Sequence, residues 1–494
     1  MKFPAAQTIL ILIAALVTLL TWFIPAGKYN SLTYLESNSQ FSIESPDSSY
    51  ILPATQASLV ELAVKIPLEK FTSGAIYKPI SIPQTYQELP AQPQGILAFL
   101  SAPIKGTIEA ADIIFLVLII GGMIGIMNTT GAFNAGMGWL SKVLQGKEFL
   151  LIIFTTILIS LGGSTFGLGE ETMAFYPILI PVFLAARYDT MVGLASIFLG
   201  SAIGIMCSTV NPFSTIIASD AAGISWTSGL QGRVLLYVIC MSVTIAYILW
   251  YARRVKKDPA KSLTDPKETN SLNYLKNAKG QVRIALTLRL RLILLIFISC
   301  FVLMITGVSQ WDWWFIEMTT VFFTGSILIG LIGKIKESVF IQSFMLGAGD
   351  LLGVAFIIGF ARGITILMND GLISDSILFY ASELTTGMHK GIFVNSLFFI
   401  YQGLSFFIPS TSGMAVLTMP IISPLADTVG IGREVIVNIY QLGTGIFNSV
   451  NPTGLVLASL GMVKIGYDKF LKFMLPLYVI LAIISMIFLT FSTF

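Results

Sequence analysis

The chain has 494 residues, of which 55% are hydrophobic and only 11% are charged, and its formal net charge is +3. An average soluble domain carries about 25% charged residues, so this composition excludes an ordinary soluble enzyme as well as a disordered chain. The near balance of 29 basic and 26 acidic residues gives no reason to expect nucleic-acid binding, and a single histidine, His389, argues against a metal-centred enzyme.

Apolar runs long enough to cross ~30 Å of hydrocarbon recur along the chain, which predicts an all-α polytopic membrane protein. The first run, residues 5–24, ends at Pro25-Ala26-Gly27 without a small-residue cleavage site, so we expect an uncleaved anchor. Residues 30–94 form a polar insertion with more acidic than basic residues, whereas 253–291 is rich in Lys and Arg. The positive-inside rule places the insertion outside the cytoplasm and the basic stretch inside it.

Pairs of short apolar arms predict two re-entrant hairpins. Arms 149–161 and 173–186 flank a tip at 162–167, and arms 393–407 and 419–425 flank a tip at 409–413. At ~1.5 Å per residue such arms are too short to cross the bilayer, so each hairpin returns to the side that it entered. We expect the first hairpin to open to the cytoplasm and the second to open to the outside.

Two further spans are interrupted near their middle, at 208–212 and at 448–454. Uninterrupted spans are predicted, besides the anchor, at 112–130, 234–251, 292–308, 315–332, 351–368 and 474–491. The predicted fold therefore has about nine transmembrane helices and two re-entrant hairpins. We expect the protein to lie in the cytoplasmic (inner) membrane, with its N-terminus in the cytoplasm and its C-terminus on the outer side.

The two halves of the sequence resemble each other. Ser208-Thr209-Val210-Asn211-Pro212 recurs 240 residues later as Asn448-Ser449-Val450-Asn451-Pro452. An odd number of predicted crossings separates the hairpins, so the repeats have inverted topology, as in many secondary transporters. We assign residues 1–252 and 315–494 to the repeats, and 253–314 to a basic cytoplasmic linker with a linking helix.

The hairpin tips and helix breaks carry the predicted chemistry. Unwound backbone at membrane depth must face protein or a water-filled cavity. Hydroxyl and amide oxygens suit Na⁺ and also hydrogen-bond a carboxylate, so we predict two symmetry-related binding sites. The first combines Ser164, Thr165, Ser208, Thr209 and Asn211; the second combines Ser410, Thr411, Ser412, Asn448, Ser449, Asn451 and Thr453. Possible Na⁺ ligands are Ser164, Thr165, Asn211, Ser410, Thr411 and Asn451. The alternative is that these side chains only bond the preceding helical turn.

Three charged residues lie within predicted membrane segments: Glu170 and Glu171 directly after the first tip, and Arg362 inside an apolar run. Buried charge is costly and therefore points to function. Glu171 could carry a proton, complete a cation site or hold the ammonium group of an amino acid, and Arg362 could bind a substrate carboxylate. The structural alternatives are a Glu–Arg pair, or a glutamate that caps the returning hairpin arm.

Three blocks of sequence, 23–29, 163–172 and 451–454, resemble the anaerobic C4-dicarboxylate carrier family of the YfcC/DcuC type, within the ion-transporter superfamily. The resemblance covers nearly the whole chain outside the insertion. It implies homodimers with an immobile scaffold and a mobile transport domain. Related superfamily members carry Ser-Asn-Thr at the hairpin tips for Na⁺, whereas this chain has Ser-Thr-Phe and Ser-Thr-Ser there, so Na⁺ and H⁺ both stay open as coupling ions.

The sequence therefore predicts a secondary active transporter, a symporter or an exchanger, without a cofactor. Its expected substrate is a small carboxylate-bearing metabolite, an amino acid or a C4-dicarboxylate, moved across the bilayer by alternating access. A passive channel for small organic ions is one alternative. An intramembrane aspartyl protease is another, because Gly347-Ala348-Gly349-Asp350 matches a Gly-x-Gly-Asp motif and Asp189 precedes it.

Overall fold

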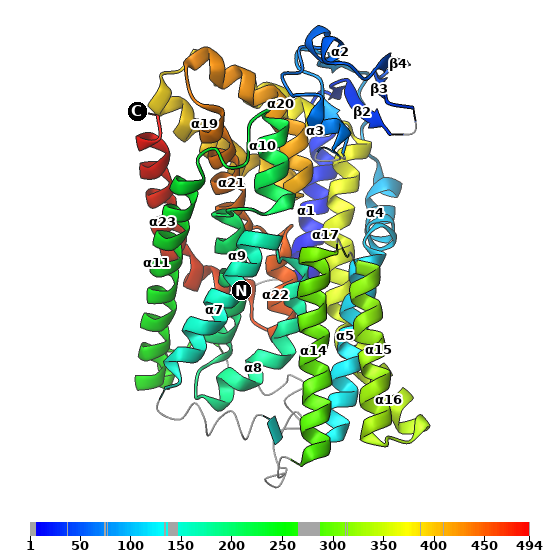
Figure 1. Ribbon diagram of the computed structural model, residues 1–494, viewed down its shortest axis with the longest axis vertical. Coiled ribbons are helices and arrows are strands. Elements are labelled where there is room, and N and C mark those ends of the chain that lie inside the picture. The colour runs from blue at the N-terminus through cyan, green and yellow to red at the C-terminus, as the bar shows by residue number, and fades with distance from the viewer. Residues whose placement is uncertain are drawn as a thin grey trace.

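The computed structural model of the protein describes residues 6–493 except 37, 74, 75, 77, 133, 134, 137–146, 265–286, 312, 314, 386 and 409. Much of the predicted cytoplasmic linker therefore lies outside the described residues. The fold is mainly helical, and the longer helices run roughly along the long axis of the molecule (Figure 1).

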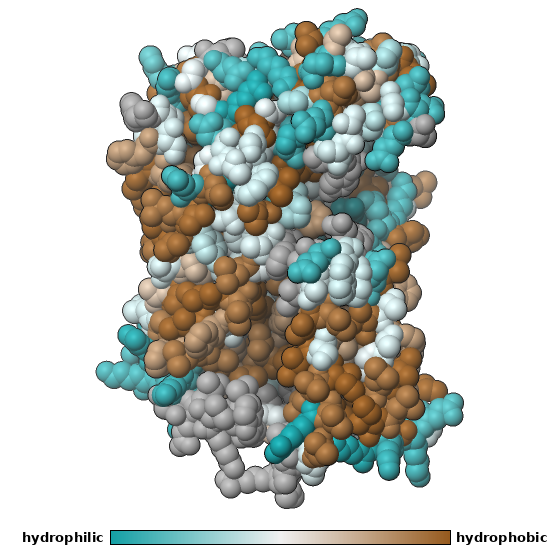
Figure 2. Space-filling view, viewed as in Figure 1, coloured by the Kyte–Doolittle hydropathy of each residue, from teal (hydrophilic) through white to brown (hydrophobic). Residues whose placement is uncertain are grey.

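Five of the described helices are long and apolar enough to cross a membrane. They are α5 (Ala111–Thr130), α11 (Leu230–Lys257), α15 (Phe315–Gly333), α17 (Leu352–Asp370) and α23 (Tyr467–Phe491). Shorter apolar helices include α1 (Ala6–Leu20). Helix α14 (Leu288–Gln310) lies in the second half of the segment 253–314. In Figure 2 hydrophobic residues cover much of the lower and left-hand surface, while hydrophilic residues gather at both ends. The chain is an integral membrane protein, and the count of nine spans stays a prediction.

The polar insertion folds into a small β-rich unit at one end of the molecule (Figure 1). Its larger described sheet has the order β4-β3-β2-β5 and is antiparallel throughout. The strands are β2 (Ser31–Leu35), β3 (Gln40–Glu44), β4 (Ser49–Pro53) and β5 (Ile80–Ser81); β1 (Gly27–Lys28) pairs with β6 (Gln87–Glu88), and the helices are α2 (Gln56–Glu61) and α3 (Glu69–Thr72). Leu32, Phe41, Ile43, Leu59 and Phe71 are fully buried, so the insertion has a core of its own.

Helices α4 (Ile96–Glu109) and α16 (Glu337–Asp350) were not predicted from the sequence. Each is followed after one residue by a membrane helix, α5 and α17 respectively, and the four helices pack crosswise, α4 on α17 and α16 on α5. Side chains of α4 such as Leu97 and Leu100 are exposed, as expected for a lipid-facing surface. Both charged residues of this segment pair with α17, Lys105 with Asp370 and Glu109 with Arg362.

Glycines make the two crossings close. A Cβ atom on Gly106 of α4 would lie 2.2 Å from the carbonyl oxygen of Gly359 on α17, and one on Gly347 of α16 would lie 2.2 Å from that of Gly121 on α5. Small residues let helix backbones approach in this way, which is the usual means of tight packing between membrane helices.

The hairpins follow the predicted order with different bounds. The first consists of α7 (Phe149–Phe166), the short 3₁₀ helix η1 (Glu170–Phe175) and α8 (Tyr176–Ala185). The second consists of α19 (Lys390–Phe407) and α20 (Thr411–Val429), after the unpredicted α18 (Ser374–Glu383). Helix α7 continues through the predicted tip, and α20 begins eight residues before the predicted arm at 419. That the hairpins are re-entrant stays a prediction.

Both predicted breaks coincide with helix ends. Helix α9 (Thr190–Met206) stops before Cys207, and the chain resumes in the π-helix η2 (Pro212–Ile216) and α10 (Ile217–Ala221). Helix α21 (Arg433–Asn448) ends at the first residue of the second predicted break, and α22 (Leu455–Val463) begins directly after that break. The remaining short helix, η3 (Pro259–Lys261), lies just after α11, in the first described part of the linker.

The α4–α17 crossing gives a stability prediction. A Cβ on Gly363 would lie 2.5 Å from the carbonyl oxygen of Ala102, which is backbone and cannot rotate away. We expect Gly363→Ala to lower the free energy of unfolding by about 1–3 kcal/mol, as overpacking does elsewhere. Thermal unfolding of the purified protein in detergent measures the change. Gly353→Ala on the same helix is the control, because its Cβ would meet nothing within 4 Å; equal effects of the two variants would contradict the close crossing.

Candidate functional site

The first break is tied to the end of α7. The side-chain amide of Asn211 donates to the carbonyl of Gly163 at 3.4 Å, and its Oδ1 accepts from the backbone N–H of Phe213 at 2.8 Å. The hydroxyls of Ser164 and Thr209 lie 3.1 Å apart, and the Thr209 N–H donates to the Ser164 hydroxyl at 3.2 Å. Asn211 and Ser164 are buried, so these bonds hold unwound backbone together away from water.

Gly167 lets the hairpin turn against this break. Its φ is +74°, and a Cβ at this position would lie 2.8 Å from Oδ1 of Asn211. Both the left-handed conformation and the close approach therefore require glycine.

The second break is tied to the end of α19 in the same manner. The amide of Asn451 donates to the carbonyl of Ser405 at 2.9 Å, and its Oδ1 accepts from the N–H of Thr453 at 3.0 Å and from the Thr453 hydroxyl at 2.8 Å. The Ser405 hydroxyl donates to Oδ1 of Asn448 at 2.8 Å. Asn451 thus makes the same contacts as Asn211: its amide bonds the C-terminal part of the first arm of the hairpin, α19 here and α7 there, and its oxygen accepts from the backbone beyond the proline.

The two breaks lie close to each other, because α9 and α21 pack together near their C-terminal ends. A Cβ on Gly445 of α21 would lie 2.5 Å from the Cα of Met206, the last residue of α9. From α21, the Gln441 amide donates to Ser208 at 2.8 Å and also to Thr215, while the Ser208 hydroxyl lies 2.8 Å from that of Ser214. Gln441 was not singled out from the sequence; the available signal was a pair of amides, Asn438 and Gln441, within a largely apolar run.

Other predicted residues make contacts outside this arrangement. The hydroxyl of Thr165 donates to the carbonyl of Leu161 at 2.6 Å, and that of Ser449 donates to Ile446 at 2.6 Å, so both bond their own helical turn. Ser410 accepts from the N–H of Gly413 at 3.2 Å and caps α20.

The remaining tip residues of the second hairpin contact other elements. The carbonyl of Thr411 accepts from the Tyr440 hydroxyl at 2.7 Å, and the Ser412 hydroxyl accepts from Nζ of Lys78 at 2.6 Å. Among the described hydrogen bonds, the second break is reached by Ser405, by the Phe406 carbonyl and by the Tyr467 hydroxyl, none of which the sequence analysis singled out.

The charged residues separate into different roles. Oε2 of Glu171 accepts from the N–H of Gly169 at 3.0 Å, so this buried carboxylate caps the turn after α7. Arg362 Nε lies 2.9 Å from Oε1 of Glu109 on α4, and both side chains are about half exposed. Arg362 therefore joins α17 to α4.

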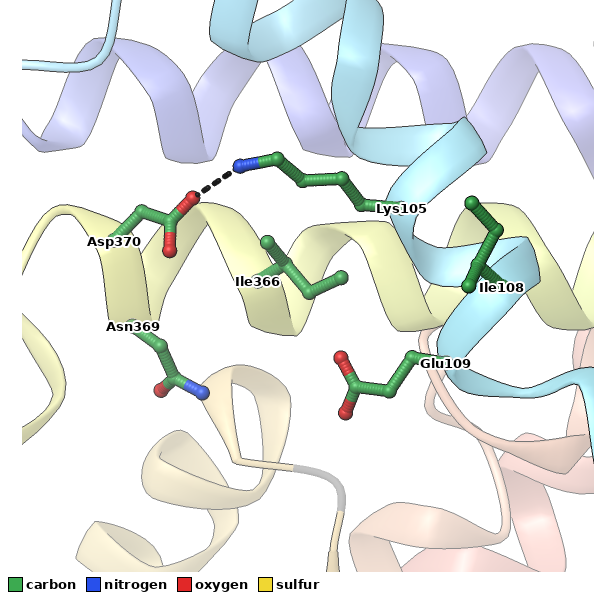
Figure 3. Close-up of a pocket in the computed structure, with 6 residues that line it drawn as sticks. All are labelled: Lys105, Ile108, Glu109, Ile366, Asn369 and Asp370. Atoms are coloured by element: carbon green, nitrogen blue, oxygen red, sulfur yellow. Dashed lines mark hydrogen bonds and ion pairs between the residues drawn. The ribbon is translucent and has the colours of Figure 1, made fainter.

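A cavity of about 390 Å³ lies beside this ion pair (Figure 3). Its lining comes from α4 and α17 and consists of Lys105, Ile108, Glu109, Ile366, Asn369 and Asp370. Lys105 Nζ bonds Asp370 at 2.9 Å, and Glu109 and Asn369 project to the same side of the two helices in the close-up. The cavity thus offers charged groups of both signs and an amide to a small polar solute.

Within the described part of the chain, no three His, Cys, Asp or Glu side chains gather as a metal site. Potential cation ligands here are neutral oxygens: the hydroxyls of Ser164 and Thr209, and the amide oxygens of Asn211, Asn448 and Asn451. Such a set suits a hard monovalent cation better than a transition metal.

Comparison with known proteins supplies relatives for the whole chain. The family model described as "C4-dicarboxylate anaerobic carrier" (DcuC) matches residues 3–493. An uncharacterised protein of Haemophilus influenzae is 42% identical over 490 residues, covering 98% of this chain and 96% of the relative. The Escherichia coli protein named "Putative basic amino acid antiporter YfcC" is 29% identical over 487 residues, which cover 95% of this chain and 92% of the relative. The solved Alcanivorax borkumensis YdaH transporter aligns with 99% of this chain and 98% of its own, at 13% identity and a TM-score of 0.41.

Ser405 provides a test of the second break. We expect Ser405→Ala to lower the free energy of unfolding by about 1 kcal/mol, because the hydrogen bond to Asn448 is lost. Amide hydrogen exchange in residues 448–454 should also become faster. Thr165→Ala is the control, since that hydroxyl bonds only its own helix among the described contacts. Unchanged exchange at the break in the Ser405 variant would contradict its assigned role.

Proposed function

Because the chain belongs to the C4-dicarboxylate anaerobic carrier family, we propose that it is a secondary active transporter for a small carboxylate-bearing metabolite, an amino acid or a C4-dicarboxylate. The observation that supports this best is the pair of Asn–Pro breaks, at 211–212 and 451–452, which meet where α9 packs on α21. Helix ends pointing at one place provide dipoles and backbone groups for a solute and its coupling ion.

The charge distribution favours an amino acid over a doubly negative substrate. Arg362 pairs with Glu109, and the adjacent cavity adds Lys105 and Asp370. A zwitterion can satisfy groups of both signs, whereas a dicarboxylate would be repelled by the carboxylates unless these were neutralised. The name of the Escherichia coli relative refers to basic amino acids, and the family description refers to C4-dicarboxylates. The dicarboxylate therefore stays the second candidate.

We propose alternating access between two inverted repeats, residues 1–252 and 315–494, with 253–314 as linker and linking helix. Matched contacts support the pairing: α4 packs on α17 as α16 packs on α5, and α1 packs on α17 as α15 packs on α5. In this proposal these helices form the scaffold of a homodimer. The hairpins and broken helices form the moving unit.

The coupling ion in this proposal is Na⁺ or H⁺. The amide and hydroxyl oxygens at the breaks would serve Na⁺, and Glu170 would serve a proton. The protein would sit in the inner membrane with its N-terminus in the cytoplasm and its C-terminus and the β-rich insertion outside, in keeping with the basic stretch 253–291.

The proposed transport function predicts that removing either asparagine amide at the breaks reduces transport. Asn211→Ala and Asn451→Ala each leave buried backbone groups without partners, at a cost of about 1–3 kcal/mol. We expect each variant to insert and fold but to lose about tenfold or more of saturable uptake or exchange in proteoliposomes. Asn395→Ala is the control, because that amide joins α19 to Thr490 of α23, away from the breaks.

Normal transport by both break variants would refute the proposed site. Flux without saturation or counter-transport would favour a channel over a transporter. A thermal-shift screen of purified protein against amino acids and dicarboxylates, with and without Na⁺, identifies the substrate class, since a ligand raises the stability of the state that binds it.

A further inference from the structure

The β-rich insertion is attached to helices of the proposed scaffold where the chain enters and leaves it. It follows α1 and precedes α4 in the sequence. The backbone N–H of Gln94, shortly before α4, donates to the hydroxyl of Thr21, just after α1, at 2.9 Å. The N–H of Gly27 donates to the carbonyl of Leu372, just after α17, at 3.0 Å. Both ends of the insertion are therefore held beside the same group of helices.

Contacts with α18 extend this attachment. The ring of Tyr86 stacks on that of Phe379 with centroids 4.1 Å apart, and the Tyr86 hydroxyl donates to that of Ser376 at 3.0 Å. The N–H of Tyr29 donates to Oδ2 of Asp375 at 2.9 Å. Helix α18 follows α17 after a short turn, so these contacts lie next to the scaffold.

A second set of contacts joins the insertion to the proposed moving unit. Nζ of Lys65 lies 3.0 Å from Oδ2 of Asp427 on α20, and Nζ of Lys70 lies 2.7 Å from Oδ1 of Asp220 on α10. A Cβ on Gly223, just after α10, would lie 2.4 Å from the carbonyl oxygen of Lys65, so the two backbones touch. Strand β5 also packs against α20 at this end of the molecule (Figure 1). The insertion therefore bridges the scaffold and the moving unit.

Arg433, at the start of α21, joins the two points at which the insertion meets the moving unit. Its guanidinium donates to Asp427 at 2.7 and 3.0 Å and to the carbonyl of Ala222, just after α10, at 2.6 Å. The end of α10 and the end of α20 are thus fixed to each other. They consequently meet the insertion, and leave it, as one body.

The two ion pairs differ in exposure. The side chains of Lys65 and Asp427 are 56% and 36% exposed, whereas those of Lys70 and Asp220 are 29% and 1% exposed. An exposed ion pair contributes little to stability and is weakened by salt. A buried carboxylate, by contrast, is costly without its counter-charge. The Lys70–Asp220 pair therefore holds the moving unit more firmly than the Lys65–Asp427 pair does.

We propose that these two ion pairs form a latch that holds the moving unit against the insertion and separates in each transport cycle. Chain connection on both sides keeps the insertion with the scaffold, while α10 and α20 are held to it by non-covalent contacts alone. When the unit moves, Asp220 and Asp427 leave the lysines and enter water. The latch rests on the proposed alternating access and adds to it a contact that stabilises one of the two conformations.

The main test links the insertion covalently to one side or the other. Lys65→Cys/Asp427→Cys joins it to the moving unit, and Tyr86→Cys/Ser376→Cys joins it to α18. Each pair is bridged by a short bis-methanethiosulfonate, which dithiothreitol cleaves. Counter-transport of radiolabelled L-arginine and of radiolabelled succinate is measured in proteoliposomes before bridging, after bridging and after cleavage. Wild type treated with the reagent controls for the three buried native cysteines.

We expect the bridge across the latch to lower counter-transport about tenfold or more, with full recovery after cleavage, because a bridged unit cannot leave the insertion. The bridge to α18 should leave the rate within about twofold, since those parts stay together in the cycle. Undiminished transport with the latch bridged would overturn the proposal, because the insertion would then travel with the hairpin. Equal inhibition by both bridges would overturn it as well.

A second measurement needs no transported solute. Amide hydrogen exchange in residues 218–223 of the purified full-length protein reports how often the latch opens. The Debye length falls from about 10 Å to about 3 Å between 0.1 M and 1 M KCl, so exchange in the wild type should become several-fold faster with salt. Lys65→Met/Lys70→Met should exchange fast at both concentrations. Lys261→Met, whose ion pair with Asp258 lies within the linker, should match the wild type.

Exchange that is independent of salt and of the two lysines would overturn the latch even if the wild type transports neither solute. Failure of the transport function is seen elsewhere: in the wild type, as flux without saturation or counter-transport. Failure of the latch alone is seen as a bridged protein that transports normally beside a normal wild type.

Discussion

The structure depends on satisfying backbone polar groups where helices stop inside a membrane protein. An N–H or carbonyl without a partner costs several kcal/mol in hydrocarbon. At both breaks an asparagine meets this requirement: its amide bonds the end of the preceding hairpin arm, and its oxygen bonds the backbone after the proline. The hairpins and the broken helices are consequently fixed to each other, and any solute bound there would contact both.

The sequence predicted these breaks well because their cause is local. Proline removes a backbone donor and interrupts a helix, and an asparagine directly before it can bond the backbone groups that the interruption leaves open. Side-chain partners were harder to predict, since they depend on which residues the packing brings near. Matching Ser164 by motif led to Ser410, whereas the helix bounds bring Ser405 to the second break. Gln441 was missed because its contact with Ser208 spans 233 residues of sequence.

Helix α4 was missed for a related reason. Lys105 and Glu109 lower the mean hydropathy of this segment. In the structure each of them forms an ion pair with α17, Lys105 with Asp370 and Glu109 with Arg362. A charge whose partner is distant in the sequence cannot be distinguished from an unpaired one until the fold is known. The insertion was recognised as extramembranous from its composition. Its β-structure and its contacts with the second hairpin come from tertiary packing that the composition does not encode.

The interlocked crossing of α4 and α17 has a consequence for how the chain is made. Lys105 of α4 emerges from the ribosome 265 residues before Asp370, its partner on α17. Gly106 of α4 likewise has no partner until Gly359 and Gly363 of α17 have been synthesised. Until α17 has been made, α4 therefore lacks both its main packing partner and the counter-charges of Lys105 and Glu109. The native arrangement of the first half consequently depends on synthesis of the second half.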